Sequence, residues 1–167
     1  MKKLTLFLAT VLVLVSTFSI LATPIVNTKN EKDIVETAIN SGQFTILTKA
    51  IEAAGLTEIL KKKNNITVFA PTDAAFAKLP AGTLEMLLKP ENKEKLKAIL
   101  LYHVVNTELT AKKVGKLNGR SVMTLQRGVL KIDTTNGVKV NDATVIKADV
   151  KAENGVIHII DTVLIPN

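Results

Sequence analysis

This sequence is poor in the residues that carry most redox, metal and stacking chemistry. It has no cysteine, no tryptophan, one tyrosine and two histidines in 167 residues. Without cysteine there can be no disulfide, thiolate nucleophile, cysteine-zinc site or lipid-modified cysteine. Hydrophobic residues make up 47% of the chain but aromatic residues only 4%, so the core must be aliphatic. Its stability must therefore come from packing alone.

Length and charge set the broad class. Domains commonly contain about 100–200 residues, so 167 residues predict one domain. The net charge of +7 favours general attraction to polyanions. Because the basic residues are spread along the chain without aromatic neighbours, we expect no nucleic-acid partner. Lysine clusters at 61–63, 93–97 and 112–116 are interpreted as solvated faces, with attraction to anionic polysaccharide or lipid as the alternative.

The N-terminus has the pattern of an export signal. A positive start, Met1–Lys3, is followed by the apolar run Leu4–Leu21 and by Ala22, a small residue at the expected cleavage position. Because Ile20 stands where a second small residue is preferred, cleavage after Ser19 is the alternative. Because the run approaches the length of about 20 residues that spans a bilayer, an uncleaved anchor is the alternative to a signal peptide. In either case we expect the folded part to be extracellular, secreted or attached to the cell envelope. Contact with the membrane is expected only through an uncleaved segment.

These features divide the chain into three parts. We predict a signal peptide or anchor over residues 1–22, a polar leader over 23–30 and one folded domain over 31–166. Within the domain, apolar residues at helical spacing predict helices over 32–40, 44–54 and 90–101.

The stretch from Ile66 to Pro80 combines a strand with the start of a helix. Ile66–Ala70 is short, apolar and rich in β-branched residues, which predicts a buried strand. Pro71 has no N–H for a ladder bond and should end this strand. Thr72 is predicted to cap the next helix, and Asp73 places a carboxylate in its first turn, where the helix dipole favours it.

The last third of the chain is dominated by strands and tight turns. Asn136-Gly137 predicts a two-residue hairpin, and Asn154-Gly155 predicts another turn. Val156–Ile165 is nearly all apolar, which predicts a strand buried on both faces. Since helices come first and strands follow without βαβ alternation, the predicted fold class is α+β.

Three stretches together resemble the fasciclin domain family. They are Thr67–Phe76, Tyr102–Val105 and Asn154–Pro166, in the order and spacing of the family, and the resemblance covers residues 31–166. The resemblance implies a wedge of two β-sheets with helices packed around it. It also implies an extracellular module of the kind found in adhesion and matrix proteins, with single-domain secreted or surface forms in microbes. No catalytic activity is general to the family.

Two recognition elements of the family fall on four residues. A Tyr-His element, linked in some animal members to integrin binding, corresponds to Tyr102 and His103, and an acidic Asp-Ile element corresponds to Asp149 and Val150. The sequence departs from the family here, because Lys147-Ala148 stands where some animal members have Glu-Pro, and valine replaces isoleucine. We therefore keep the four positions as binding candidates without transferring integrin binding.

The two histidines are interpreted mainly as structural residues. His158 lies in the middle of an apolar strand, where a buried histidine is expected to donate to a carboxylate or carbonyl. His103 is expected to hold a helix-to-strand junction, with ligand contact as the alternative. Asp161 is assigned a structural role.

Catalytic and metal sites are weakly supported. A hydrolase could be assembled only from Ser121, a histidine and Asp161, but the G-x-S-x-G elbow is absent. Two distant histidines without cysteine predict no zinc site. Calcium could be held by Asp142, Asp149 and Glu153 only outside an EF-hand, whose spacing is absent. We predict no enzyme, no metal and no cofactor.

Three functional hypotheses follow. The first is a monomeric, non-catalytic module, secreted or on the cell surface, that binds an extracellular or cell-surface protein or polysaccharide in adhesion or in the matrix or envelope. The alternative is a carrier of a small apolar ligand in a cleft between helices and sheets. The third is an extracellular hydrolase, which requires a hydroxyl such as that of Ser121 beside His103 or His158.

Overall fold

A computed structural model describes residues 32–166 of the chain. The predicted signal peptide or anchor (1–22) and the polar leader (23–30) lie outside the described residues. None of the helices in the described range has the length and apolar character that crossing a membrane requires.

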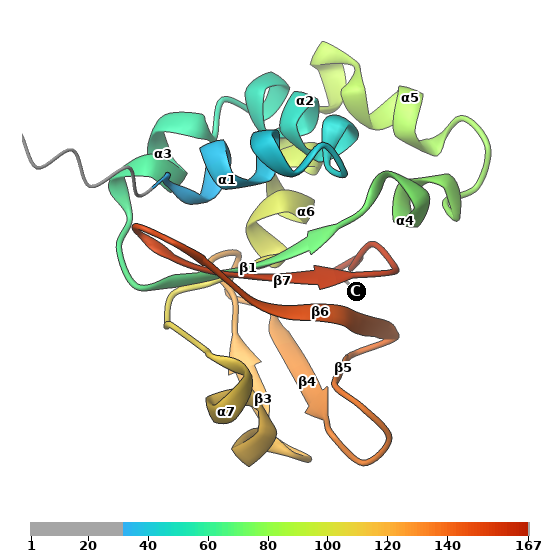
Figure 1. The fold of residues 1–167 in the computed structure, drawn as a ribbon. Helices are drawn as coiled ribbons and strands as arrows, with labels where there is room; N and C mark the ends of the chain where they lie inside the picture. The colour runs from blue at the N-terminus through green and yellow to red at the C-terminus, as the bar shows by residue number, and fades with distance from the viewer. Residues whose placement is uncertain (1–31, 167) are drawn as a thin grey trace, which may run out of the picture.

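Helices dominate the first part of the described chain, which we call the helical half (residues 32–105). They form a layer over the central strands (Figure 1). The elements in order are α1 (Ile34–Ser41), α2 (Thr45–Ala54), α3 (Thr57–Lys62), β1 (Ile66–Pro71), α4 (Asp73–Ala77), α5 (Thr83–Leu88), the 3-10 turn η1 (Pro90–Asn92), α6 (Lys93–Tyr102) and β2 (Val104–Val105).

Strands dominate the rest of the described chain. Residues 106–152, which we call the lower arm, contain α7 (Ala111–Val114), the 3-10 turn η2 (Gly115–Leu117), β3 (Ser121–Met123), β4 (Val129–Asp133), β5 (Lys139–Val140) and β6 (Ala143–Ala152). The last strand, β7 (Gly155–Ile160), returns to the centre of the molecule beside β1 (Figure 1). The predicted α+β class is thus confirmed.

The seven strands of the described range follow the order β2-β1-β7-β6-β5-β4-β3. β1 and β7 are parallel and the other pairs antiparallel. The register of β6 against β7 shifts on both sides of Lys147, and such irregularities bend a strand. β6 therefore connects the central strands β1 and β7 to β5, β4 and β3, and its bend gives the sheet the shape of a wedge. At the far ends, a bridge between Val105 and Thr124 brings the β2 and β3 edges together.

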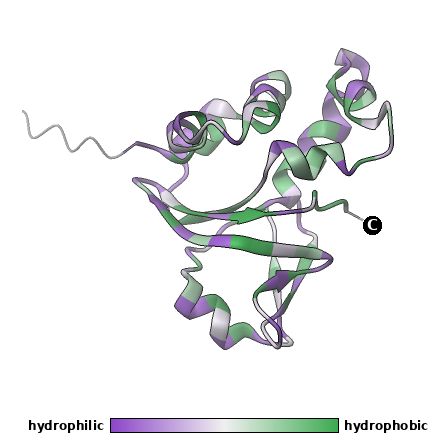
Figure 2. Ribbon diagram, turned by 45° about the vertical axis from the view of Figure 1, so that its right-hand side comes forward, coloured by the Kyte–Doolittle hydropathy of each residue, from purple (hydrophilic) through white to green (hydrophobic). Residues whose placement is uncertain are grey.

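Two hydrophobic cores lie on opposite faces of the central strands. The larger one lies between the helices and the sheet and is mostly aliphatic, with Ile157 and Ile159 of β7 facing it. The smaller one fills the wedge, and Phe69 and Ile160 contribute to it from β1 and β7. All residues of β1 and β7 are buried, so both strands contact both cores. Figure 2 shows hydrophobic colouring along these central strands, with hydrophilic residues interspersed on the helices.

The junction after β1 has the predicted cap and one unexpected bond. The Thr72 hydroxyl accepts a hydrogen bond from Ala75 N, which confirms it as the cap of α4. Asp73 stands in the first turn of α4, but its carboxylate accepts hydrogen bonds from Thr45 N and Ile46 N at the start of α2. Asp73 therefore joins two helices, a role that its position in the sequence does not indicate.

The turns differ from the prediction in two details. Asn136-Gly137 does not form a two-residue hairpin: β4 and β5 pair only as far as Asp133 and Lys139, which leaves a longer connection. In the β6–β7 hairpin, Gly155 belongs to β7 rather than to the turn. A Cβ there would lie 2.0 Å from the Ile66 carbonyl oxygen, so this glycine is required by the close approach of β1.

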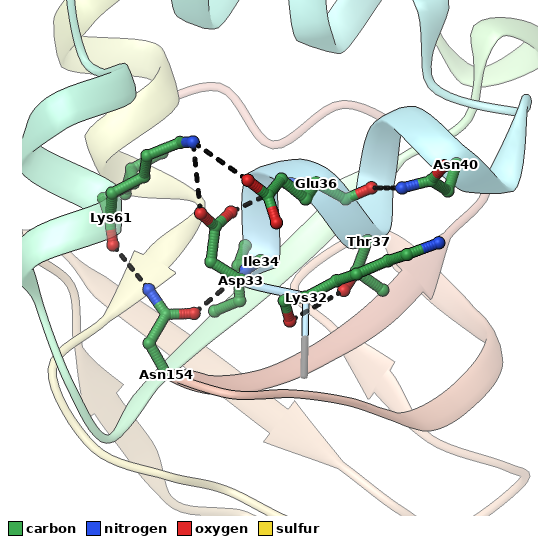
Figure 3. A network of polar contacts seen from close by, with 9 residues as sticks. Lys32, Asp33, Ile34, Glu36, Thr37, Asn40, Lys61 and Asn154 are labelled. Carbon is green, nitrogen blue, oxygen red and sulfur yellow. Dashed lines mark hydrogen bonds and ion pairs between the residues drawn. The ribbon is translucent and has the colours of Figure 1, made fainter. Parts of the chain in front are cut away.

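Asn154 anchors the helical layer to the β6–β7 turn. Its buried amide accepts a hydrogen bond from Ile34 N (2.9 Å) and donates one to the Leu60 carbonyl (2.7 Å) (Figure 3). Above it, Lys61 lies 3.3 Å from both Asp33, which caps α1, and Glu36. The Asn154 side chain thus holds α1 and α3 to the sheet, although the sequence indicates only that Asn154 is a turn residue.

Candidate functional site

His103 is buried at the junction between α6 and β2 and uses both ring nitrogens. Nδ1 lies 2.8 Å from the Ile99 carbonyl oxygen, and Nε2 accepts a hydrogen bond from Leu164 N at 2.9 Å. These partners assign the Nδ1–H tautomer. Burial lowers the pKa of His103 to about 4, although the Ile99 carbonyl opposes the shift. The ring is therefore neutral near pH 7 and holds the segment that follows β7.

His158 is buried on β7, and the donor and acceptor roles of its two ring nitrogens are exchanged relative to those of His103. Nε2 lies 2.6 Å from the Leu109 carbonyl oxygen, and Nδ1 accepts a longer bond, 3.4 Å, from Asp149 N. These partners assign the Nε2–H tautomer. The ring also stacks on Phe69 with a centroid separation of 5.6 Å. Burial lowers its pKa, opposed by the Leu109 carbonyl and by the charge of Asp149.

Tyr102 is almost fully buried, and its hydroxyl is already bonded. The hydroxyl donates to the Val129 carbonyl (2.9 Å) and accepts from Asn141 Nδ2 (3.2 Å). The ring lies so close to Gly128 that a Cβ there would be 2.5 Å from a ring carbon. Tyr102 therefore fixes the loop before β4 and the turn after β5.

Asp149 and Val150 lie in the irregular part of β6. Asp149 is exposed, has a positive φ of 58°, and its Oδ1 accepts a hydrogen bond from Ala111 N at the start of α7. Val150 is partly buried against the helical core. These two neighbours thus contact opposite sides of the sheet.

Asp161 follows β7 and joins it to the start of β6. Oδ1 accepts hydrogen bonds from Thr144 N (2.8 Å) and the Thr162 hydroxyl, and Oδ2 lies 3.3 Å from Lys78 Nζ. Burial would raise the pKa of this carboxyl, but these bonds outweigh it, so its pKa is lowered. The carboxylate is thus held in its ionised form.

The arrangement does not support the hydrolase hypothesis. Both histidines are bonded to backbone atoms through both ring nitrogens, so neither is free to accept a proton from Ser121. Within residues 32–166, no group of three His, Asp or Glu side chains is placed to hold a metal ion.

An open groove lies at the edge of the wedge, between β4 and the segment after β7. Its volume is about 860 Å³. Tyr102 contributes to its floor, and the exposed side chains of Val129 and Ile165 stand at its rim. Lys131 and Asp142 add charges of both signs. The groove therefore differs in place and in lining from the apolar cleft between helices and sheets that a carrier of a small apolar ligand would need.

Comparison with known proteins identifies the family of this domain. The Fasciclin domain model matches residues 42–166. The chain belongs to the fasciclin domain family. Protein sll1483 of Synechocystis sp. is 50% identical over 140 residues, which cover 83% of this chain and 76% of that protein. Transforming growth factor-beta-induced protein ig-h3 of Sus scrofa is 40% identical over 134 residues, which cover 80% of this chain and 19% of that protein.

A solved structure shows the same fold. The FAS1 domain pair from the insect cell adhesion molecule Fasciclin I matches this fasciclin domain with a TM-score of 0.58 and 22% sequence identity. The match covers 77% of this chain and 45% of that chain. The expected fasciclin-like fold with helices packed around the strands is confirmed, and the two sheets expected for the wedge are the two parts of one continuous seven-stranded sheet.

The four candidate binding residues do not form one site in this fasciclin domain. Tyr102 lines the groove, and His103 supports it indirectly through Leu164 N. Asp149 contacts α7 and Val150 packs under the helices. The groove residues Val129 and Ile165 were missed. The alternation of β4 places Val129 on the same exposed face as Lys131 and Asp133, a signal that could have found it, whereas Ile165 lies after β7 and outside any strand.

Proposed function

We propose that this fasciclin domain is a monomeric interaction module, secreted or attached to the cell surface, that catalyses no reaction. The observation that carries the proposal is that the buried polar groups are all hydrogen-bonded within the domain, whereas apolar side chains at the rim of the groove remain exposed. Every buried side-chain nitrogen and oxygen in the described residues has a hydrogen-bond partner, so the polar interior is fully used in holding the fold.

The groove is the surface we propose for recognition of an extracellular or cell-surface protein. Its rim exposes 53% of Val129 and 55% of Ile165, and apolar side chains that remain exposed at a concave surface are typical of interaction sites. Met123 extends this rim, because it pairs with Val129 across β3 and β4 and is itself exposed. Similarity to ig-h3 and to an insect cell adhesion molecule supports a role outside the cell.

Binding of the full chain to isolated envelopes of its native cells tests this proposal. The variants Val129→Glu and Ile165→Glu should each weaken saturable binding about tenfold, since a charge replaces an exposed apolar side chain that the partner would cover. Ile39→Glu and Met86→Glu are matched controls, because these side chains are similarly exposed (52% and 50%) but lie on α1 and α5, in the helical layer on the other side of the central strands from β4 (Figure 1). Equal loss in all four variants, or no saturable binding of the unchanged chain, would contradict the proposal.

A further inference from the structure

The lower arm is more strongly basic than the helical half. It carries nine basic and four acidic side chains, a net charge of +5, whereas the helical half carries ten and eight, a net charge of +2. All nine basic residues of the lower arm are exposed, namely Lys112, Lys113, Lys116, Arg120, Arg127, Lys131, Lys139, Lys147 and Lys151. The excess charge of the described chain is therefore concentrated on this arm.

Ion pairs neutralise part of the helical half but leave the lower arm unpaired. Lys61 lies 3.3 Å from both Asp33 and Glu36, and Lys62 lies 3.8 Å from Glu58. Among the described residues, each ion pair involves a lysine of the helical half, and none involves a basic residue of the lower arm. The arm thus presents cationic groups that no carboxylate neutralises, although the Lys113 ammonium donates a hydrogen bond to the Glu108 carbonyl.

Two of the four acidic residues of the arm are occupied by its own backbone. Asp149 accepts a hydrogen bond from Ala111 N, and Asp133 accepts one from Thr135 N. Hydrogen bonding and, to a lesser degree, Lys139 lower the pKa of Asp133, which keeps it ionised. These carboxylates reduce the positive charge locally but are not paired with the lysines that surround them.

The fold brings separate stretches of basic residues side by side. The bond from Ala111 N to Asp149 sets the start of α7, and with it Lys112, against the part of β6 that lies between Lys147 and Lys151. The basic surface therefore continues from α7 onto β6.

A second contact extends this surface around the arm. Arg120 directly precedes Ser121, which pairs with Lys131 across β3 and β4. Lys139 lies on β5, the next strand, opposite Asp133. The basic residues thus follow α7, β6, β4 and β5 rather than one flat face.

We propose that the lower arm binds an anionic polysaccharide, a linear polymer that carries carboxylate or sulfate groups. Residues 106–152 contain no Phe, Tyr or Trp, so the arm offers no aromatic platform for stacking bases, which disfavours single-stranded nucleic acid. A flexible polymer can follow basic groups around the arm, whereas a bilayer meets only one side. This binding surface borders the groove and shares Lys131 with it, but it is centred on α7 and β6, and the inference does not depend on the function proposed for the groove.

The mechanism is release of counterions from the polymer. Each lysine that replaces a condensed cation on the polymer lets that cation return to bulk solution, so affinity falls as salt rises. Because no rigid pocket is involved, the arm should bind long polymers better than short oligosaccharides.

Affinity of the full chain for a linear polyuronate, measured at low and moderate salt, tests the inference. The variant Lys112→Gln/Lys113→Gln/Lys116→Gln should lose about tenfold in affinity at low salt and show a shallower salt dependence. The control Lys49→Gln/Lys93→Gln/Lys95→Gln removes the same charge from exposed lysines of the helical half and should change affinity less than about twofold. Unchanged melting temperatures verify that both variants are folded.

Four outcomes would overturn the inference. They are no binding to the polyuronate, equal binding to uncharged dextran, equal loss in the two triple variants, and binding to anionic phospholipid vesicles in place of the polymer. Ile165→Glu should retain polyuronate binding, so failure of the groove proposal and failure of this inference are distinguishable.

Discussion

The core under the helices and the core of the wedge are stabilised in different ways. Under the helices, an aliphatic core is buried between long elements, and ion pairs at the surface join α1 to α3. In the wedge, β2 and β5 have two residues each and β3 has three, so few ladder bonds are available. Buried polar side chains compensate by bonding directly to backbone atoms, as His103, His158 and Tyr102 do.

This difference explains why histidines sit in an otherwise aliphatic protein. A short strand leaves neighbouring backbone groups without strand partners, and a buried unpaired N–H or C=O is costly. An imidazole can satisfy one donor and one acceptor from separate segments at the same time. His103 and His158 do this for four backbone groups, two of which, those of Leu109 and Leu164, lie outside helices and strands.

The largest expected effect comes from Gly155 of β7, a strand that contacts both the core under the helices and the core of the wedge. Gly155→Ala puts a Cβ 2.0 Å from the Ile66 carbonyl oxygen and should separate β1 from β7. We expect a loss of at least about 3 kcal/mol in the free energy of unfolding, measured by urea denaturation. Gly115→Ala is the control, because a Cβ there meets nothing within 4 Å and its φ is −58°. A mild effect of Gly155→Ala would show that the two strands can shift apart.

The second prediction concerns pH and the wedge. Unfolded His103 titrates near 6.5, but the folded residue has a pKa of about 4, so the unfolded state binds more protons between these values. The contribution of His103 to stability is therefore complete above pH 6.5 and is lost as pH falls towards 4. We expect about 3 kcal/mol over this range, and His158 adds to it in the same direction.

Unfolding free energies at pH 7 and pH 4.5 measure this loss. His103→Asn keeps a donor for the Ile99 carbonyl but cannot titrate, so its pH dependence should be smaller than that of the unchanged chain. Asp133 and Asp161 do not account for this loss, because their pKa values are lowered from 3.8 and the stability that they contribute is lost only at more acidic pH. Identical pH dependence in the two proteins would contradict the role assigned to His103.

A smaller effect is expected from His158. His158→Ala leaves the Leu109 carbonyl and Asp149 N without their partner and should lower the free energy of unfolding by about 2 kcal/mol. His158→Gln should recover part of this loss, because its amide nitrogen can reach the position of Nε2. Thermal melts of the three proteins decide the matter, and an unchanged melting temperature for His158→Ala would refute the interpretation.

The sequence predicted the parts of the fold that depend on local pattern. β1 follows from its β-branched run, the Thr72 cap from its position after Pro71, and the burial of β7 from its apolar letters. The α+β class follows from the order of these elements. The fasciclin resemblance added the wedge, which periodicity alone does not indicate.

Other features could not be predicted because they depend on contacts between distant segments. Asn154 has the letter of a turn residue, but its amide joins α1 and α3 to the sheet. Asp73 caps α2 rather than its own helix. For the same reason the sequence identified Tyr102 but not Asn141, Val129 or Ile165, which meet it at the groove only after β4 and the last segment fold together.

The central claim is that both histidines are neutral side chains that hold the fold through hydrogen bonds to the backbone, and that recognition takes place on the outer surface. Nitrogen-15 NMR of the histidine rings tests it most directly, because ring nitrogen shifts report tautomer and charge. The account predicts the Nδ1–H tautomer for His103, the Nε2–H tautomer for His158, no protonation of His103 between pH 7.5 and 5.5, and a pKa of His158 below its ordinary value. Titration of either ring with a pKa near 6.5, or the same tautomer for both, would contradict it.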